Sequence, residues 1–507
     1  MAHPTEDPVD LLIVGGGING AGIARDAVGR GLSVMLVEQD DLASHTSSAS
    51  TKLIHGGLRY LEYGEFRLVR EALIERERLW SMAPHIIWPL RFVLPQTQSP
   101  RPAWMVRLGL FLYDHLGGRE RLPGTQTVAL GTSAFGAGLA DRKGKAFVYS
   151  DCWVEDSRLV VLNARDAAVR GAEIRTRTRL LGARREDGAW TTMIADAAGE
   201  RRVRARALVN AAGPWVAEVL AGAGGSQTKR GVRLVKGSHL VVPRLYEGNH
   251  AFMLQNPDRR IVFTVPYEGR FTLLGTTDEP WTGPPGKAHI SDGETRYLLD
   301  TANRYFDRRI GEADIAWSYA GIRPLYDDQA GSASAVTRDY VLDVDTGPAD
   351  AAGAPMLSVF GGKITTYRKL AEHAMRELAR FFPKAGSAWT AGATLPGGDM
   401  DDFDAFVRAL VTERPGLPPV LLRRLARAYG TDVRVLLGTA RTSGDLGEDL
   451  GGGLTVAEVD WLRDREWART AEDILYRRSK LGLHVPAGTA ERLESYLAEV
   501  SATPVAA

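Results

Sequence analysis

The segment of residues 9–38 constrains the fold of this chain more than any other. It begins with an apolar run, residues 11–14, which has the length and β-branched character of a buried parallel strand. Three glycines in G-x-G-x-x-G spacing follow it: Gly15, Gly17 and Gly20. Small residues then predict a helix, and a second apolar run ends at Glu38. This order of strand, glycine turn, helix and strand is typical of a Rossmann-type dinucleotide-binding fold.

Each of these residues has a physical role in such a fold. Gly15 allows a sharp turn out of the strand, Gly17 allows the backbone to approach a pyrophosphate, and Gly20 allows close packing of helix and strand. The helix N-terminus offers free N–H groups to the anion. Glu38 is placed to accept hydrogen bonds from a ribose hydroxyl, and an acid there argues against a 2′-phosphate. The pattern does not separate NAD from FAD, and a glycine turn without a ligand is the alternative.

Composition narrows the class of protein. With 507 residues the chain can form two or three domains, and its 44% hydrophobic and 25% charged content is ordinary for a globular protein. A net charge of +1 gives no general attraction to nucleic acid, and a single cysteine, Cys152, excludes an intramolecular disulfide. No apolar run approaches the roughly 20 residues that span a bilayer, and the N-terminus does not resemble a signal peptide. We expect a cytoplasmic protein, either free or attached to a membrane face.

Two segments after Glu38 carry candidate site residues. Residues 44–52 are dense in hydroxyl groups, which can donate to phosphate and ribityl oxygens. The sequence HGGLRY then places His55, Arg59 and Tyr60 around a pair of glycines. These side chains supply a titratable base, a fixed cation and a phenol beside the predicted cofactor loop. A structural role for His55 is the alternative.

The region that follows combines an amphipathic pattern with an apolar one. Residues 65–82 predict an amphipathic helix that Pro84 ends. Residues 104–113 are apolar except for Arg107, and arginines flank them on both sides. This run is too short to cross a membrane. It could lie in the membrane interface as a monotopic anchor, or it could be a buried helix with basic flanks.

The second half of the chain returns to the nucleotide-binding pattern and then becomes helical. A strand over residues 207–210 and the glycine turn after it are expected to rejoin the first domain. Short alternating strands within residues 231–345 predict a mixed or antiparallel sheet under a substrate pocket, with Arg323 held extended by the proline after it. Residues 358–375 repeat the order of strand, double glycine and helix. Beyond residue 395 we expect a helical cap or dimerisation module without chemistry of its own.

Together these patterns predict an α/β protein with an added helical domain. A mixed or antiparallel β-sheet substrate domain is expected to be inserted into the Rossmann-type domain. The predicted ranges are 8–90, 146–230 and 346–390 for the three parts of the nucleotide-binding domain, 91–145 for an insertion that contains the apolar run, 231–345 for the substrate sheet and 391–507 for the helical domain.

A set of long motifs resembles one known family, the aerobic FAD-dependent glycerol-3-phosphate dehydrogenases. In chain order the motifs are GGGINGAGIARDA, TSSASTKLIHGGLRYLE, FRLVREAL, RPAWMVRLGLFLYDHLG, YSDCWVEDSRLV, KGSHLVVP, RIVF, GTTD, GIRPL, TRDY, SVFGGKITTYRKLAEHA and SGDLGEDLG. The resemblance implies the glutathione-reductase-like FAD fold of the D-amino-acid-oxidase superfamily, attachment to the inner face of the cell membrane as a peripheral protein, and a membrane quinone as electron acceptor. We also expect a homodimer, and no nucleic-acid partner.

The resemblance assigns roles to residues of this chain. The family's FAD site falls on Gly15, Gly17, Gly20, Glu38, Ser47, Ser48, Lys363, Ile364, Thr365 and Thr366. Its substrate pocket falls on Arg59, Tyr60, Arg323 and Lys363. No metal site is implied. His45 stands where the family carries small or cysteine residues, and it could lie near the flavin edge.

The implied reaction is the oxidation of glycerol 3-phosphate to dihydroxyacetone phosphate. The C2 hydrogen leaves as a hydride to flavin N5 while a base removes the proton of the C2 hydroxyl. We predict His55 as this base, because a neutral imidazole suits the task near neutral pH, and His239 as the second candidate. Arg59 and Arg323 would bind the phosphate through paired N–H donors. Lys363 and a helix dipole would stabilise the reduced flavin.

Three other functions are alternatives. A glycerol-3-phosphate oxidase would share the first half-reaction and use oxygen as acceptor; the basic-flanked apolar run favours a membrane acceptor instead. An FAD-dependent RNA-modifying protein would need a basic face interleaved with aromatic residues, whereas the arginines here are scattered. A flavin-binding membrane protein without enzyme activity would not need the predicted pocket residues Arg59, Arg323 and Lys363.

Overall fold

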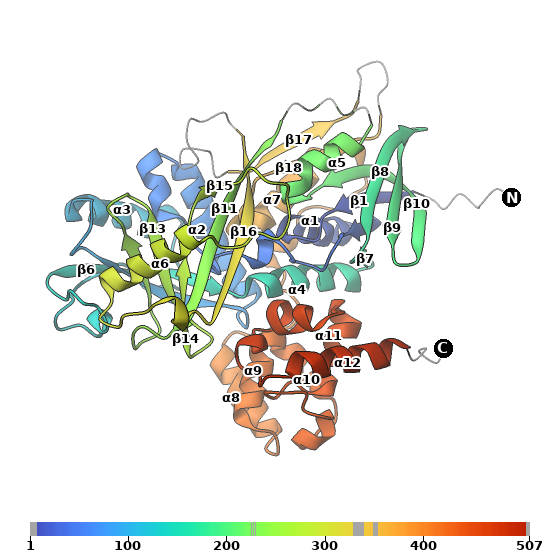
Figure 1. Cartoon of the computed structure of the whole chain (residues 1–507). Helices are drawn as coiled ribbons and strands as arrows, with labels where there is room; N and C mark the ends of the chain where they lie inside the picture. Colours follow the sequence, from blue (N-terminus) through green and yellow to red (C-terminus); the bar gives the residue numbers. More distant parts are fainter. Residues whose placement is uncertain are drawn as a thin grey trace.

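Two β-sheets and a group of C-terminal helices make up the fold (Figure 1). The computed structural model describes residues 8–224, 226, 228, 230–327, 339–347 and 353–502. Thr337 and Arg338 of the motif TRDY lie outside the described residues. In Figure 1 the C-terminal helices form a body of their own below the two sheets.

The first sheet contains the predicted nucleotide-binding strands. Its order is β17–β18–β10–β1–β2–β7, and a hairpin of β8 and β9 is attached to β10. The bounds are β1 (Val9–Val14), β2 (Val34–Val37), β7 (Glu173–Arg175), β8 (Arg179–Glu186), β9 (Ala189–Asp196), β10 (Gly199–Asn210), β17 (Val341–Asp345) and β18 (Met356–Phe360). Strands β18, β10, β1, β2 and β7 run parallel, as the first apolar runs predict.

The glycine turn joins β1 to helix α1 (Ile18–Gly29). Gly15 has a φ of +114°, and a Cβ there would lie 2.4 Å from the carbonyl oxygen of Ala211. A Cβ on Gly20 would lie 1.9 Å from the carbonyl oxygen of Gly15. Only glycine therefore fits these two positions. Helix α1 then packs against α4 (Asp156–Val169) and α7 (Tyr367–Leu378), and together they cover one face of the sheet.

The second sheet is mixed and mainly antiparallel. Its order is β15–β11–β14–β13–β12–β4–β6–β3, with β16 paired to β11 and β5 paired to β6. The bounds are β3 (Leu53–Ile54), β4 (Ile87–Pro95), β5 (Gln126–Ala129), β6 (Lys145–Val154), β11 (Val232–Pro243), β12 (Ala251–Gln255), β13 (Ile261–Tyr267), β14 (Phe271–Gly275), β15 (Glu279–Pro280) and β16 (Trp317–Tyr326). Helix α6 (Asp292–Tyr305) packs on this sheet. The predicted strands within residues 231–345 are present.

The sheets divide the chain differently from the predicted ranges at two places. Residues 91–145, expected as an insertion, supply most of β4 and all of β5 to the second sheet. Strand β6, at the start of the range 146–230 expected in the nucleotide-binding domain, also lies in the second sheet, because it pairs along its length with β4. The chain returns to the first sheet only through α4 and β7.

Two helices lie beside the second sheet and next to each other. Helix α2 (Phe66–Met82) matches the predicted amphipathic helix. Helix α3 (Ala103–Leu116) contains the apolar run and contacts α2. It buries one face and exposes four large apolar side chains on the other: Trp104, Met105, Leu108 and Phe111. The run is therefore a half-buried helix. Among the described residues, no helix is both long enough and apolar enough to span a bilayer.

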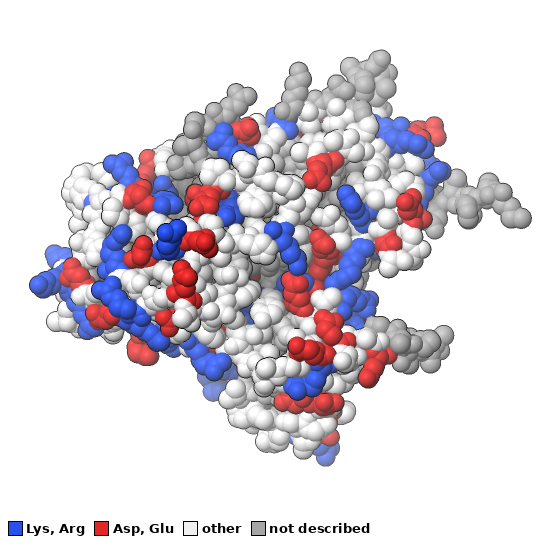
Figure 2. Space-filling view, viewed as in Figure 1, with Lys and Arg blue, Asp and Glu red and all other residues white. Residues whose placement is uncertain are grey.

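The C-terminal helices have a hydrophobic core of their own. Their bounds are α8 (Phe403–Glu413), α9 (Pro419–Tyr429), α10 (Val433–Leu437), α11 (Val456–Glu466) and α12 (Thr489–Ala502), with a π-helical turn at Asp473–Arg478. Helix α4 lies between this domain and the first sheet (Figure 1). On the face shown in Figure 2, basic and acidic side chains are interspersed.

Candidate functional site

A cavity of about 650 Å³ lies where the carboxyl ends of the first sheet's strands meet the second sheet. From the first sheet it is lined by the turns after β1, β2, β10 and β18, and from the second sheet by residues of β11, β12, β13 and β16. Open α/β sheets bind their ligands at this end of the strands. The cavity therefore combines the predicted nucleotide site with the predicted substrate pocket.

Most of the predicted cofactor residues line this cavity. Those that do so are Gly15, Gly17, Glu38, Ser47, Lys363, Ile364 and Thr365. Gly20, Ser48 and Thr366 are not in its lining: Gly20 packs against the glycine turn, the Ser48 hydroxyl donates to the His45 carbonyl at 3.2 Å, and Thr366 is buried. Their assignment as cofactor contacts stays a prediction.

Glu38 ends β2 beside the glycine turn. One carboxylate oxygen accepts a hydrogen bond from the Gly16 amide at 2.6 Å, and the other accepts one from the Asp40 amide at 2.9 Å. Burial raises the pKa of Glu38, although these two amides oppose the shift. The Ser47 hydroxyl, which accepts from the Ile18 amide at 3.0 Å, lies at the start of the helix. This end of the cavity has the donors and acceptors of a ribose and pyrophosphate site.

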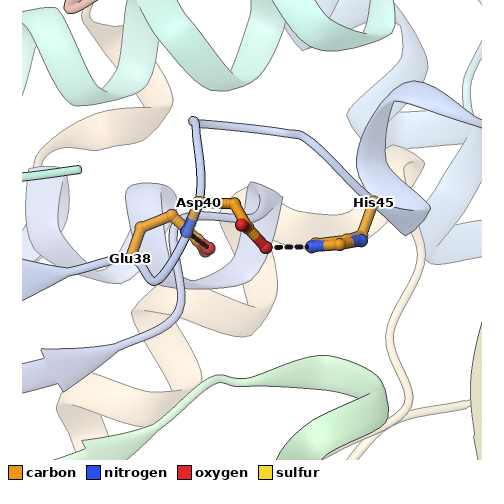
Figure 3. Close-up of side chains that lie close together, drawn as sticks. All are labelled: Glu38, Asp40 and His45. Carbon is orange, nitrogen blue, oxygen red and sulfur yellow. Dashed lines mark hydrogen bonds and ion pairs between the residues drawn. The ribbon is translucent and has the colours of Figure 1, made fainter. Parts of the chain in front are cut away.

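His45 lies at the Glu38 end of the cavity (Figure 3). Its Nε2 is 2.8 Å from a carboxylate oxygen of Asp40, and its ring is 4.5 Å from the ring of Trp215. The hydrogen bond from His45 lowers the pKa of Asp40. The imidazole thus lies beside Glu38, the predicted ribose acceptor, and the expectation that His45 lies near the flavin edge stays a prediction. The three ligand-type atoms of Glu38, Asp40 and His45 lie within 4.8 Å of one another, but backbone amides and the imidazole itself already satisfy the carboxylates.

His55 lies at the other end, directly after β3. Its backbone amide donates to the Thr365 hydroxyl at 3.3 Å, which joins two segments 310 residues apart. Burial, together with the charges of Lys363 and Arg76, lowers the pKa of His55 to about 4. The imidazole is therefore neutral at neutral pH, as a proton acceptor must be. The ammonium of Lys363 lies 3.8 Å from the ring centre of Tyr60, so the two predicted substrate residues are in contact.

Arg323 reaches the cavity from β16. Its guanidinium donates to Asp278 at 2.7 Å and to the hydroxyl of Thr276 at 2.8 Å. Both partners belong to the motif GTTD, to which the sequence alone assigns no role. Arg59 also lines the cavity and donates to the hydroxyl of Tyr63 at 3.3 Å, while its buried Nε has no partner among the described residues. The two predicted phosphate-binding arginines are thus brought to one cavity.

His239, the second candidate base, points into the same cavity from β11. Its Nε2 lies 3.0 Å from the hydroxyl of Thr51, and its ring stacks on Tyr319 at 4.7 Å. Its buried Nδ1 has no partner in the part of the chain that the structure describes. Burial, with the charges of Arg323 and Lys52, lowers the pKa of His239 well below its usual value. Both histidines are therefore neutral, and geometry does not separate their roles.

Several lining residues are not among the sequence candidates. Met253, Phe263 and Tyr149 lie on strands of the second sheet, and Arg260 directly precedes β13. The pairing of β13 with β12 and β14, and of β6 with β4, brings them to the cavity. The motif RIVF, which contains Arg260 and Phe263, is the one sequence signal that could have found two of them.

The site fits a dinucleotide with a flavin ring. A Cβ on Gly17 would lie 3.1 Å from the Ser47 hydroxyl, so the glycine leaves the helix N-terminus open to a close ligand. Two buried polar atoms near it, Asn19 Oδ1 and Ser44 Oγ, have no partner among the described residues. A nucleotide-binding sheet whose cavity continues under a second sheet, toward neutral histidines and arginines, defines a dinucleotide-dependent oxidoreductase.

Comparison with known proteins identifies the family. The chain belongs to the FAD-dependent oxidoreductases, whose family model matches residues 10–368. A second model, described as the C-terminal domain of alpha-glycerophosphate oxidase, matches residues 388–502. The cofactor of the chain is FAD. Glu38, Ser47 and the glycine turn would hold its adenosine and pyrophosphate, and residues 363–365 with His55 would lie by its ring.

Relatives align over nearly the whole chain. The chain is 54% identical to a glycerol-3-phosphate dehydrogenase of Pseudomonas aeruginosa, over 97% of this chain and 96% of that protein. It is 52% identical to a D-erythritol 1-phosphate dehydrogenase of Brucella abortus, over 96% of each. The X-ray structure of the glycerol-3-phosphate dehydrogenase from Bacillus halodurans complexed with FAD superposes with a TM-score of 0.77 at 26% identity, covering 99% of this chain and 92% of that one. The predicted family, fold class and cofactor are confirmed.

Proposed function

We propose that this chain oxidises sn-glycerol 3-phosphate to dihydroxyacetone phosphate with FAD and passes the electrons to a membrane quinone. The observation that carries the proposal is one cavity that joins the nucleotide-binding turn to Arg59, Arg323 and Lys363, with two neutral histidines. The relative from Pseudomonas aeruginosa that is named a glycerol-3-phosphate dehydrogenase supports the choice of substrate.

The chain's residues bind the substrate and accept a proton from it. FAD, when bound, supplies the two-electron acceptor for the oxidation. The imidazole of His55 takes the proton of the C2 hydroxyl while the C2–H bond breaks and the carbonyl forms. His239 is the second candidate for this role. Because both imidazoles are neutral before the reaction, either can accept a proton near neutral pH.

The phosphate is bound by cations of the same cavity. Arg323 and Arg59 present guanidinium groups that match phosphate oxygens in pairs. The contact of Arg323 with Asp278 holds the guanidinium in place, so less side-chain entropy is lost on binding. Lys363, fixed over the ring of Tyr60, adds a third positive charge.

An apolar patch beside the cavity supports a membrane acceptor. The patch consists of Tyr63, Phe66, Trp104, Met105, Leu108 and Phe111, whose side chains are exposed by 45–67%. Helix α3 carries four of these residues and contacts both α2 and the turn that ends at Tyr63. Single exposed apolar residues are common, but adjacent ones mark an interaction surface. We propose that this patch enters the membrane interface at the cytoplasmic face.

The patch and the lining of the cavity share a residue. Tyr63 is exposed in the patch and lines the cavity as well, and the buried Leu68 of α2 also lines it. A quinone dissolved in the membrane would therefore reach the cavity without crossing water. This arrangement favours the dehydrogenase over the oxidase alternative, which needs no membrane.

A second substrate is supported by the relative from Brucella abortus, a D-erythritol 1-phosphate dehydrogenase at 52% identity. Both substrates carry a phosphate on a terminal carbon and a secondary hydroxyl beside it. The same cations would therefore bind the phosphate, and the same base would accept the hydroxyl proton. The deciding experiment adds glycerol 3-phosphate, D-erythritol 1-phosphate or glycerol to the FAD-loaded protein without oxygen and follows loss of the flavin absorbance. Bleaching by glycerol 3-phosphate at the lowest concentration supports the proposal. Bleaching by D-erythritol 1-phosphate alone would show that this compound, and not glycerol 3-phosphate, is the substrate.

We further propose a homodimer that forms through the C-terminal domain. Val420 on α9 and Val435 on α10 expose 83% and 66% of their surface, which supports a contact surface there. Sedimentation of the detergent-free protein gives the mass directly. A monomer at all concentrations would contradict a dimer.

A further inference from the structure

The C-terminal domain contacts the loop that carries Glu38. This loop, residues 38–45, is called the cofactor loop below; Figure 3 shows it between Glu38 and His45. Within it, Asp41 is buried and accepts two hydrogen bonds from Arg478, each at 2.7 Å. Arg477 donates to the same carboxylate at 2.8 Å. Both arginines belong to the π-helical turn of the C-terminal domain, 436 and 437 residues from Asp41.

The position of Asp41 affects both sides of the cofactor loop. On one side, the Asp40 amide donates to the Glu38 carboxylate at 2.9 Å. On the other side, the Ala43 amide donates to the Gly16 carbonyl at 3.1 Å, inside the glycine turn. Any displacement of Asp41 must therefore disturb the predicted ribose acceptor and the predicted pyrophosphate turn together.

A second contact joins the same two parts of the molecule. Arg177 donates to Asp473 of the π-helical turn at 2.6 Å, and its backbone amide donates to the Asp40 carbonyl at 2.8 Å. The adjacent Thr178 amide donates to the Glu38 carbonyl at 2.7 Å. The cofactor loop is thus held between the segment that follows β7 and the C-terminal domain.

The Asp41 carboxylate keeps its buried position only while the arginines pair with it. The side chains of Asp41 and Arg478 are almost entirely inaccessible to solvent, with 1% and 0% exposed. A buried carboxylate that loses its cations is costly, so it moves toward water or takes up a proton. Without the arginines the cofactor loop would not keep its position.

We propose that Arg477 and Arg478 are positioning residues for FAD, which act through Asp41 and make the C-terminal domain a clamp on the cofactor loop. The two arginines do not line the cavity. Their effect is on the affinity for FAD, whereas substrate chemistry is left to the residues at the other end of the cavity. The inference rests on FAD as cofactor and not on the identity of the substrate.

The test measures FAD binding by the full chain after its flavin has been removed. Flavin fluorescence is titrated for the wild type and for Asp41→Asn, Arg478→Gln and Arg477→Gln, the last of which leaves Arg478 paired with Asp41. The matched control is Asp432→Asn, because Asp432 pairs with Arg165 of α4 at 3.0 Å across the same domain boundary without touching the cofactor loop. Circular dichroism confirms that each variant is folded.

We expect the Kd for FAD to rise about tenfold or more in the Asp41 and arginine variants, within the usual range of couplings between sites, and to stay within twofold of wild type in the control. If Asp41→Asn or Arg478→Gln does not fold, the Kd of Arg477→Gln is the deciding measurement. A Kd within twofold of wild type in folded Arg477→Gln would overturn the proposal. So would an equal rise in Asp432→Asn, because the effect would then be general loss of domain packing. Since FAD binding is measured without substrate, failure of the proposed function does not affect the result.

Discussion

The hydroxyl of Tyr113 accepts a hydrogen bond from the backbone amide of Gly56 at 2.7 Å. The same hydroxyl donates to the buried carboxylate of Asp151, which pairs with Arg76 at 2.6 Å. Gly56 directly follows His55, and Tyr113 lies on the buried face of α3. The helix that carries the apolar patch is therefore hydrogen-bonded to the turn that holds the predicted base.

Removing this hydroxyl is expected to destabilise the protein. Tyr113→Phe leaves the Gly56 amide and one side of the Asp151 carboxylate without their partner, which costs about 1–3 kcal/mol of unfolding free energy. Urea unfolding followed by flavin fluorescence measures the change. Tyr496→Phe, which removes a less buried hydroxyl bonded to Asp460 at 2.9 Å, is the control and should cost less. An equal loss of unfolding free energy in both variants would show that the hydrogen bonds of Tyr113 contribute no more than a less buried one.

The predicted base is tested by replacing His55. We expect His55→Ala to slow anaerobic flavin reduction by about 10²- to 10⁴-fold, the usual contribution of a positioned base. Since the pKa of His55 is lowered to about 4, its imidazole stays neutral down to that pH. The wild-type rate should thus fall only as the pH approaches 4, and not near 6.5 as for an ordinary histidine.

The control is His250→Ala, because His250 also has a pKa lowered to about 4 but does not line the cavity. It should reduce at the wild-type rate. If His55→Ala keeps the wild-type rate at every pH while His239→Ala loses it, the two histidines exchange roles.

Substrate binding is expected to depend on Arg323. Arg323→Ala removes a charge-assisted contact to phosphate worth roughly 1.5–3 kcal/mol, so the Kd for substrate should rise about 10- to 150-fold. Stopped-flow reduction at increasing substrate concentration gives this Kd separately from the rate of reduction. Arg142→Ala, which breaks a 3.0 Å ion pair with Asp307 away from the cavity, should bind substrate normally. If Arg323→Ala binds substrate with the wild-type Kd, Arg323 does not bind the phosphate.

The apolar patch is expected to bind membranes. Trp104→Ser and Leu108→Ser together remove two of its exposed side chains, and each large apolar group is worth about 1.5–3 kcal/mol when buried. Co-sedimentation with phospholipid vesicles should therefore fall steeply, while anaerobic reduction by substrate is unchanged. Val420→Ser, at a more exposed valine of the C-terminal domain, should still sediment with vesicles. Undiminished binding by the double variant would exclude the patch as the anchor.

The nucleotide-binding half of the site could be predicted because its signals are local. Gly15, Gly17 and Glu38 lie within one strand–turn–helix–strand unit, whose geometry is set by sterics and apolar periodicity. The second sheet is different. Thr51 meets His239 across 188 residues, and His55 meets Thr365 across 310. Such contacts depend on the order of the strands in the sheet, and a short motif does not predict that order.

The same limit applies to the predicted domain ranges. The expected insertion at residues 91–145 changes composition, but its strands complete a sheet begun elsewhere, because β4 pairs with both β6 and β12. His45 is expected near the flavin edge because the family carries small or cysteine residues there, and this stays a prediction. The chain turns back at Asp40, whose carboxylate binds the imidazole next to Glu38.

The measurement that tests the central claim most directly is reoxidation of the substrate-reduced protein. Glycerol 3-phosphate is added without oxygen until the flavin absorbance is lost, and then either a soluble quinone or air-saturated buffer is mixed in. We predict bleaching by the substrate and recovery of the absorbance far faster with quinone than with air. Equal recovery with air would indicate an oxidase, and no bleaching by glycerol 3-phosphate would contradict the proposed substrate.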